Sequence, residues 1–257
     1  MIIDTHIHLD NKQYYDDVEE VIARAIDNGV EYFVIPGADP KDLPRAKELA
    51  YKHPSVYFAV GMHPYDIQNY SESIIREYAE DEKCLAIGEC GLDYFRLPED
   101  EAEREEEIRS QKAIFRAHIR LANELNKPLI VQIRDASHDA RVILEEECSK
   151  GGVLHCFNAD EELLSLAKLG FYFGIGGVLT FKNARKLVNV LPKIPKERLV
   201  LETDGPYLTP HPYRGKRNEP LYTSLVADKV SELLDTKRSE IEALTTQNAC
   251  KLFAINI

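Results

Sequence analysis

The 257-residue sequence lacks the features that mark several large classes of protein. No apolar run approaches the roughly 20 residues that a membrane-spanning helix needs. The first residues contain no basic stretch followed by the short apolar core of a secretion signal. We therefore expect a soluble protein that is not secreted and has no membrane partner.

Cysteine is scarce, and its spacing forms no known pattern. The five cysteines are odd in number and include no C-x-x-C pair, which argues against a disulfide framework and against a zinc ribbon. Reduced thiols are typical of the cytoplasm, and we expect the protein there. Cys90 and Cys156 lie in strand-like runs, and we interpret both as small core residues.

The sequence also lacks an excess of basic residues. Its formal net charge is −12, which argues against broad, nonspecific binding of a polyanion because such binding needs a basic face. A polyanion held locally by metal ions and a few cations stays compatible with this charge. Hydrophobic residues make up 44% and charged residues 30%, as in an ordinary globular protein.

Apolar, β-branched runs recur along the chain, and segments with helical periodicity separate them. Alternating strands and helices indicate parallel βαβ units, and eight such units in one chain of this length predict a (β/α)8 TIM barrel in a single domain over residues 1–257. An open, doubly wound sheet is the alternative, but the glycine-rich fingerprint that it often carries is absent after the first strand. The predicted strands are Ile2–His6, Tyr32–Pro36, Val56–Gly61, Cys84–Glu89, Leu129–Arg134, Gly152–Phe157, Phe171–Ile175 and Arg198–Glu202. The predicted helices are Asp16–Asn28, Pro40–His53, Ser71–Asp81, Glu101–Asn126, His138–Lys150, Asp160–Leu169, Phe181–Leu191, Leu221–Leu234 and Ser239–Phe253.

The first predicted strand ends in an H-x-H motif, His6-Ile7-His8. Residues two apart on a strand face the same side, so the two imidazoles can hold one metal ion. Active sites of TIM barrels lie at the C-terminal ends of the strands. The position of this motif therefore predicts a metal-dependent hydrolase.

Other metal-binding residue types close the later strands. His63 follows the third strand, Glu89 ends the fourth, His155 lies in the sixth, and Asp204 follows the eighth. Nitrogen and oxygen ligands without thiolates suit Zn²⁺, Mn²⁺ or Mg²⁺. Glu89 is the best candidate to bridge two ions, and Asp204 can take the proton of an activated water. Glu202, two residues before Asp204, is expected to support the site rather than to bind an ion.

In their order along the chain, these motifs resemble those of the TatD-type metal-dependent DNases. The resemblance covers nearly the whole sequence, and the segment from Pro210 to Pro220 is its most specific single match. The other matching motifs are His6-Ile7-His8, Gly61-Met62-His63-Pro64, Gly88-Glu89-Cys90-Gly91-Leu92-Asp93-Tyr94, Arg134-Asp135-Ala136, His155-Cys156-Phe157, Glu202-Thr203-Asp204 and Thr246–Phe253.

The resemblance implies a TIM barrel that hydrolyses DNA phosphodiester bonds, as a 3′–5′ exonuclease on single strands, with two divalent metal ions. It implies DNA as the substrate, no obligate protein partner and a monomer. By similarity, one ion is held by His6, His8, Glu89 and Asp204. Glu89 bridges to a second ion, which Gln132 and His155 complete. His63, Arg214 and Lys216 face the substrate phosphate, and Glu89, Asp204 and His63 carry the catalysis.

One residue departs from the family pattern, which has histidine where this chain has Gln132. An amide oxygen is a weaker ligand for Zn²⁺ than an imidazole nitrogen, so the second metal site can be weak or selective for a harder ion such as Mg²⁺ or Mn²⁺. Our hypothesis is that substrate phosphate oxygens complete this site. The alternative is that Gln132 was introduced to trap an inactive form.

Two other functions stay open at this point. An amidohydrolase acting on a C–N or ester bond shares the barrel and the H-x-H start, but such enzymes often have a lysine where this chain has Glu89. A catalytically impaired DNA-binding protein is supported only by Gln132, and the acidic charge counts against it. For Arg134 and Asp135 an internal ion pair is the main interpretation, and contact with substrate is the minor one.

Overall fold

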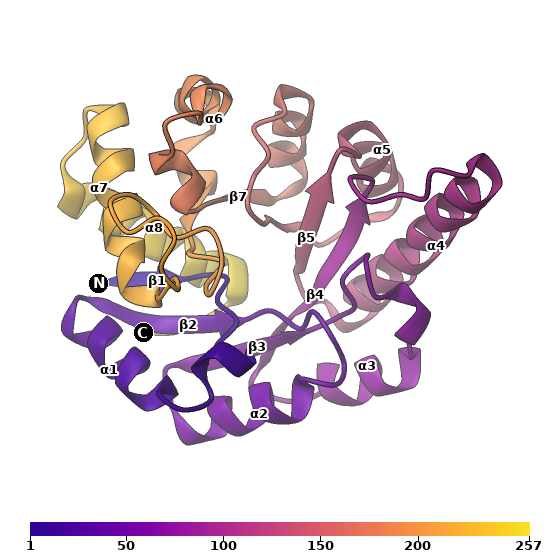
Figure 1. Cartoon of the computed structure of the whole chain (residues 1–257), viewed down its shortest axis with the longest axis horizontal. Helices are drawn as coiled ribbons and strands as arrows, with labels where there is room; N and C mark the ends of the chain where they lie inside the picture. The colour runs from indigo at the N-terminus through magenta and orange to yellow at the C-terminus, as the bar shows by residue number, and fades with distance from the viewer.

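Eight parallel strands in sequential order form a barrel in the computed structural model, which describes residues 1–257 (Figure 1). Each strand pairs with the next one along the chain, as the alternation of strand and helix predicts. The predicted TIM barrel is confirmed. The strands are β1 (Ile2–Asp4), β2 (Val30–Ile35), β3 (Val56–Val60), β4 (Cys84–Asp93), β5 (Leu129–Arg134), β6 (Gly152–Leu154), β7 (Phe171–Ile175) and β8 (Leu199–Leu201).

Helices surround the barrel and cover the outer face of its strands (Figure 1). None of them is long and apolar enough to cross a membrane. They are α1 (Val18–Asp27), α2 (Leu43–Lys52), α3 (Glu72–Ala79), α4 (Glu101–Leu125), α5 (Ser137–Glu147), α6 (Arg185–Val190), α7 (Thr223–Leu234) and α8 (Arg238–Phe253). The segment Glu161–Leu169, predicted as an ordinary helix, is wound as a 3-10 helix.

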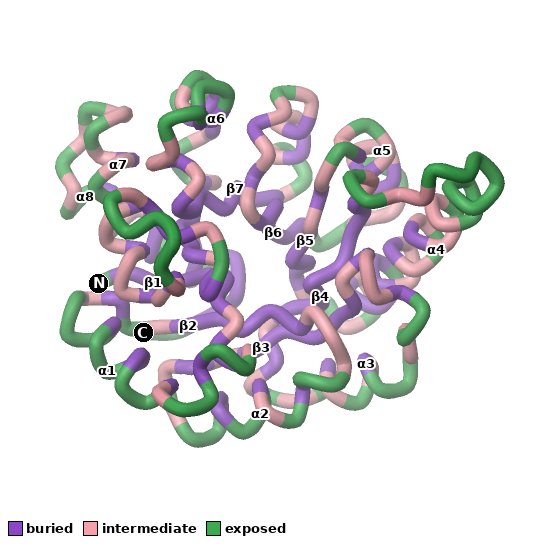
Figure 2. The backbone as a smooth tube through the Cα atoms, in the orientation of Figure 1, coloured by how far each residue is buried: buried purple, intermediate pink, exposed green.

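The strands alternate their side chains between two apolar layers, so the tube through the strands is buried along most of its length (Figure 2). One apolar side chain from each strand belongs to an inner cluster, and Ala249, Leu252 and Phe253 of α8 pack against this inner set. The remaining apolar side chains lie between the strands and the helices. The inner set consists of Ile3, Val34, Ala59, Ala86, Ile130, Val153, Tyr172 and Val200.

The barrel closes between the first and the last strand, beyond the regular part of both. The N–H of Thr5 donates to the carbonyl of Leu201 at 3.0 Å, and the N–H of Asp204 donates to the carbonyl of His6 at 2.9 Å. The N–H of His8 then donates to Gly205 at 2.9 Å. Closure therefore depends on the residues that also carry the predicted metal ligands.

Candidate metal centre

His6 and His8 follow β1 at the seam of the barrel. Their ring centroids are 5.2 Å apart, and His6 is buried while His8 is partly exposed. Ile7 between them is fully buried and forms a bridge to Gly205. The apolar residue thus fixes the backbone, and both imidazoles reach the carboxyl end of the barrel, as the H-x-H motif predicts.

Glu89 lies within β4 and is 3% exposed. Gly88 and Gly91 flank it with φ angles of +147° and +144°, and a Cβ on either glycine would lie within 2.4 Å of a carbonyl oxygen of β5. Only glycine combines such angles with so close an approach of two strands. The two glycines let β4 lie against β5 around the carboxylate.

The Glu89 carboxylate faces three imidazoles. One oxygen, Oε2, lies 3.4 Å from Nε2 of His6 and 3.9 Å from Nε2 of His8. The other, Oε1, lies 3.6 Å from Nε2 of His63. The two oxygens of Glu89 therefore point to different neighbours, as a bridging carboxylate requires.

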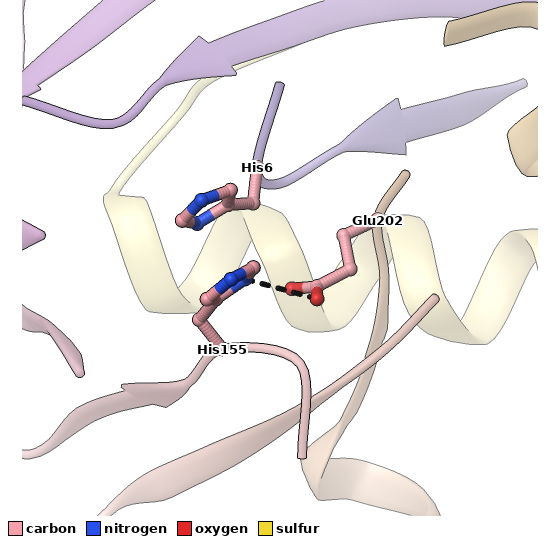
Figure 3. Close-up of side chains that lie close together, drawn as sticks. All are labelled: His6, His155 and Glu202. Atoms are coloured by element: carbon pink, nitrogen blue, oxygen red, sulfur yellow. Dashed lines mark ion pairs between the residues drawn. The ribbon is translucent and has the colours of Figure 1, made fainter. Parts of the chain in front are cut away.

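His155 follows β6 and stacks on His6, with the ring centroids 3.4 Å apart. Its Nδ1 lies 3.0 Å from Oε1 of Glu202, as Figure 3 shows, which leaves Nε2 free on the side of Asp204 at 3.9 Å from Oδ1. Glu202 is fully buried and also accepts the N–H of Cys156 at 2.7 Å. The prediction that Glu202 supports the site fits this geometry, in which it would orient His155, although His6, His155 and Glu202 also form a group close enough to hold an ion themselves.

Asp204 follows β8 with a φ angle of +57°, in the left-handed region that non-glycine residues seldom adopt. Its Oδ1 lies 3.7 Å from Nε2 of His6 and 3.6 Å from Nε2 of His8. Such backbone conformations are often found at functional sites. Here the conformation places the carboxylate between the first strand and His155.

The donor atoms fit a metal ion. Both ring nitrogens of His6 are buried and have no hydrogen-bond partner, which is costly for polar atoms. The ligand atoms around a tetrahedral ion lie about 3.3 Å from one another, because each is about 2.0–2.1 Å from the metal. The separations of 3.4 to 3.9 Å among the donors of His6, His8, Glu89 and Asp204 are close to this spacing.

The charges of the site also suit a cation. Burial raises the pKa of Glu89, but the neighbouring His6 and His63 more than reverse this and hold it well below the usual value. The pKa of Asp204 is lowered too, because His8 and His155 outweigh its burial. Burial lowers the pKa of His6, so its ring is neutral at physiological pH. The site therefore offers ionised carboxylates and a neutral imidazole, the forms that bind metals.

His155 behaves differently. Burial alone would lower its pKa, but the negative charges of Glu202 and Asp204 raise the pKa to about 10. Without an ion, this imidazole carries a proton at neutral pH. A metal bound by Nε2 must displace that proton, so its affinity rises with pH.

Gln132 of β5 lines the same cavity as Glu89. Its Nε2 donates to Oδ2 of Asp93 at 3.2 Å. Asp93 is itself held by the hydroxyl of Tyr65 at 2.8 Å and by the N–H of Phe95 at 3.0 Å. This contact fixes the orientation of the amide and leaves its oxygen free, so Gln132 can offer one neutral oxygen ligand.

His63 follows β3, and its Nδ1 accepts the N–H of Tyr65 at 3.1 Å. In a neutral imidazole the proton then sits on Nε2, the atom that lies beside Glu89. His63 is partly exposed at the cavity. It can therefore donate a hydrogen bond to a ligand that reaches Glu89.

The site lies at the base of a cavity of about 1000 Å³. Arg214 and Lys216, predicted to face the phosphate, do not line it. The guanidinium of Arg214 donates to the carbonyl of Thr209 at 2.9 Å, and the amine of Lys216 lies above the ring of Tyr213. Their contact with a phosphate stays a prediction.

The cations that do line the cavity are Arg96, Arg134 and Lys186. Sequence reasoning missed Arg96 and Lys186, because neither belongs to a motif at a strand end. For Arg134 the expected ion pair with Asp135 is wrong, since its guanidinium lies 3.5 Å above the ring of Phe95 and Asp135 is exposed. The ring holds the cation at the cavity without a carboxylate.

A family model described as TatD related DNase matches residues 3–254. The chain belongs to this family. The TatD-type resemblance of the sequence is thus confirmed, and the metal-dependent hydrolases of this family are the relatives of the chain.

Individual TatD relatives agree with this membership. An uncharacterised metal-dependent hydrolase, YabD of Bacillus subtilis, is 44% identical, and the match covers 100% of both chains. A protein of Shigella flexneri named 3′-5′ ssDNA/RNA exonuclease TatD is 34% identical over 99% of each chain. The crystal structure of YJJV, a TatD homologue from Escherichia coli, superposes with a TM-score of 0.90 at 27% identity, covering 99% of this chain and 98% of that one.

Proposed function

We propose that this chain is a metal-dependent exonuclease that removes nucleotides from the 3′ end of single-stranded DNA. The arrangement of Glu89 is the observation that carries the proposal. Its two oxygens face different histidines, His6 and His63, at 3.4 and 3.6 Å. A carboxylate in this position can be shared by two ions, and paired divalent ions are a common device for phosphodiester hydrolysis.

The residues separate into two ligand groups. His6, His8, Glu89 and Asp204 would hold one ion. Glu89 with His155 and the amide oxygen of Gln132 would hold a second. Bound ions would lower the pKa of water and neutralise charge on the phosphate. The ligand types suit Zn²⁺, Mn²⁺ or Mg²⁺, and the neutral oxygen of Gln132 favours a harder ion in the second site.

The chain's own groups can take part in the proton movements. Asp204 is ionised and partly exposed to the cavity, so it can accept a proton from the attacking water. The water forms a bond to phosphorus, the bond from phosphorus to the 3′ oxygen of the retained strand breaks, and that oxygen takes up a proton from the surrounding water. The Nε2–H of His63 can hydrogen-bond to a phosphate oxygen, and Gln132 is held in place by Asp93.

The name of the Shigella relative supports the polarity and the preference for single strands. Glu89 also weighs against an amidohydrolase of the type that uses a lysine on the fourth strand as the bridging ligand. DNA is therefore the proposed substrate. We propose no obligate protein partner, a monomer and a cytoplasmic location.

The test is cleavage of a 5′-labelled single-stranded oligodeoxynucleotide, resolved to single nucleotides, with EDTA, Mg²⁺, Mn²⁺ or Zn²⁺. We expect a ladder that shortens from the 3′ end, needs a divalent ion and is lost in Asp204→Asn. The matched control is Asp228→Asn, which removes an exposed carboxylate that pairs with Arg238 on the outside of the barrel. Absence of cleavage with every metal by the folded protein would contradict the proposal.

A further inference from the structure

The cavity above the metal centre has an uneven distribution of charge. Asp39, Asp42 and Asp66, which follow β2 and β3, line one side. Arg134, at the end of β5, and Lys186, in α6 after β7, line another. Because strand order follows the chain around the barrel, these acidic and basic residues lie on different sides of the opening. A polyanion that enters the site meets repulsion on one side and attraction on the other.

The basic side leads into a second hollow of about 480 Å³. Three residues, Arg134, Asn158 and Lys186, line both this hollow and the main cavity, so they form the ridge between them. The second hollow has its own carboxylates, Asp135, Asp160 and Glu162, but none of them lines the main cavity. A chain that leaves the metal centre in this direction must cross the ridge.

The two cations of the ridge are available to a ligand. Arg134 is partly buried and lies over the ring of Phe95. Neither Arg134 nor Lys186 forms an ion pair with a carboxylate, whereas Arg141 nearby is bound by Glu145 and Glu162. A guanidinium stacked on one face keeps its N–H edges free for a phosphate.

Most of the remaining polar groups around the second hollow are already engaged. The side-chain amide of Asn158 donates to Ile133 and Ser137, and its oxygen accepts the N–H of Asp160, so this residue is a fixed part of the ridge. Glu162 is neutralised by Arg141 and His138. The carboxylates of Asp135 and Asp160 also line the hollow but not the main cavity, so they lie off the ridge, where the free cations are Arg134 and Lys186.

We propose that Arg134 and Lys186, separated by Asn158, form an exit subsite that binds the phosphate next to the scissile one on the retained part of a single strand. This inference rests on the proposed exonuclease function and names the direction in which the strand leaves. The acidic side of the cavity then takes the terminal nucleoside, which carries no further phosphate. Charge thus distinguishes a strand end from the interior of a strand.

The test is equilibrium binding of a 5′-fluorescein-labelled single-stranded oligothymidylate, followed by anisotropy over a range of salt concentrations. Ca²⁺ replaces the catalytic ion, and a gel checks that the oligonucleotide stays intact. Each phosphate contact contributes about −0.7 to the slope of log K against log salt for single strands. We expect Lys186→Gln to weaken binding about two- to fivefold at low salt and to reduce the steepness of this slope by about 0.7.

The matched control is Lys182→Gln, which removes an exposed lysine from the turn just before α6 that lines neither hollow. It should leave the salt slope unchanged. Arg134→Gln should act in the same direction as Lys186→Gln, and its melting temperature is measured because Arg134 also packs on Phe95. An unchanged slope in Lys186→Gln, or an equal change in Lys182→Gln, overturns the exit subsite.

A neutral linkage in the DNA locates the contact. A methylphosphonate in place of the phosphate next to the terminal linkage should weaken binding to the wild type and have little further effect in Lys186→Gln. Equal losses in both proteins would contradict the assignment. If the wild type binds with the expected slope but cleaves no DNA with any metal, the exonuclease proposal fails while the subsite stands. If it binds no oligonucleotide at all, both proposals fall.

Discussion

The two ends of the barrel are built from the same strands but differ in chemistry. At the end covered by α8, the inner side chains are apolar and pack against Leu252 and Phe253. At the other end, buried histidines and carboxylates face one another at 3.4 to 3.9 Å with hydrogen-bonding atoms left unpaired. The first arrangement lowers the free energy of the fold, and the second stores unfavourable contacts that a bound ion can relieve. Stability and function are thus separated along the axis of the barrel.

The largest expected effect comes from the polar end. Glu89→Gln removes the charge that two ligand groups share, and we expect the rate of oligonucleotide cleavage to fall by about 10³-fold or more. The free energy of unfolding should fall less than in a truncation of the core, because favourable contacts of the ionised carboxylate with His6 and His63 are weakened but no apolar packing is lost. Cleavage assays and urea unfolding of the same preparation measure both. A loss of stability as large as that of a core truncation would contradict the separation of the two ends.

The opposite end should give the converse result. Phe253→Ala removes a ring that is 3% exposed and packs against the inner side chains at one end of the barrel. We therefore expect the free energy of unfolding to fall by about 3–4 kcal/mol. The folded fraction should keep its metal affinity. Ile257→Ala, at a residue that is 53% exposed, is the control and should change stability by less than about 0.5 kcal/mol. Loss of metal binding in folded Phe253→Ala would show that the ends are coupled.

A histidine away from both ends tests whether the acid sensitivity of the protein comes from the metal centre. Burial lowers the pKa of His118 in α4 to about 4. Because the folded state binds its proton less readily than the unfolded state, stability is present above pH 6.5 and is lost as the pH falls toward 4. This residue should contribute roughly 3 kcal/mol of that loss. In His118→Gln, urea unfolding between pH 7 and 4 should show a flatter dependence, and an unchanged one would assign the loss elsewhere.

The smallest expected effect comes from a substitution within the candidate metal centre. Gln132→His exchanges a neutral amide oxygen for an imidazole nitrogen, and we expect Zn²⁺ affinity at the second site to rise by about 10- to 100-fold. Isothermal titration with Zn²⁺ and Mg²⁺ measures affinity and stoichiometry. Gln111→His is the control, because Gln111 contacts the backbone of Asp93 on the other side of that residue. Unchanged stoichiometry and rate in Gln132→His would disprove a weak second site.

Local patterns were enough to predict much of the fold. The helix predicted over Glu101–Asn126 is observed as α4, because Asp100 caps its first turn and Asn126 ends it in the left-handed conformation. The 3-10 winding of Glu161–Leu169 was not predicted, since its apolar spacing is compatible with either helix. β1 ends at Asp4, and the residues that follow are held on both sides, by the bond of Thr5 to Leu201 of β8 and by the bond of Ile7 to Val34 of β2.

In the candidate site too, some features could be predicted from the sequence and others could not. Residues at strand ends, such as His6 and Asp204, could be assigned because strand position alone determines where they lie. The contact of Gln132 with Asp93 joins two strands, and the stacking of Arg134 on Phe95 depends on the loop after β4. Such contacts depend on how neighbouring strands and loops meet in space, which periodicity does not contain. For this reason the sequence predicted an ion pair of Arg134 with Asp135 rather than its contact with Phe95.

The seam of the barrel has a consequence for how the protein matures. His6 and His8 follow the first strand and Asp204 follows the last one, and all three meet where the last strand pairs with the first. An ion bound by them would link the segment after the first strand to the segment after the last strand. A nascent or truncated chain without the last strand has no complete set of ligands. Metal uptake would therefore mark the moment at which the barrel is finished.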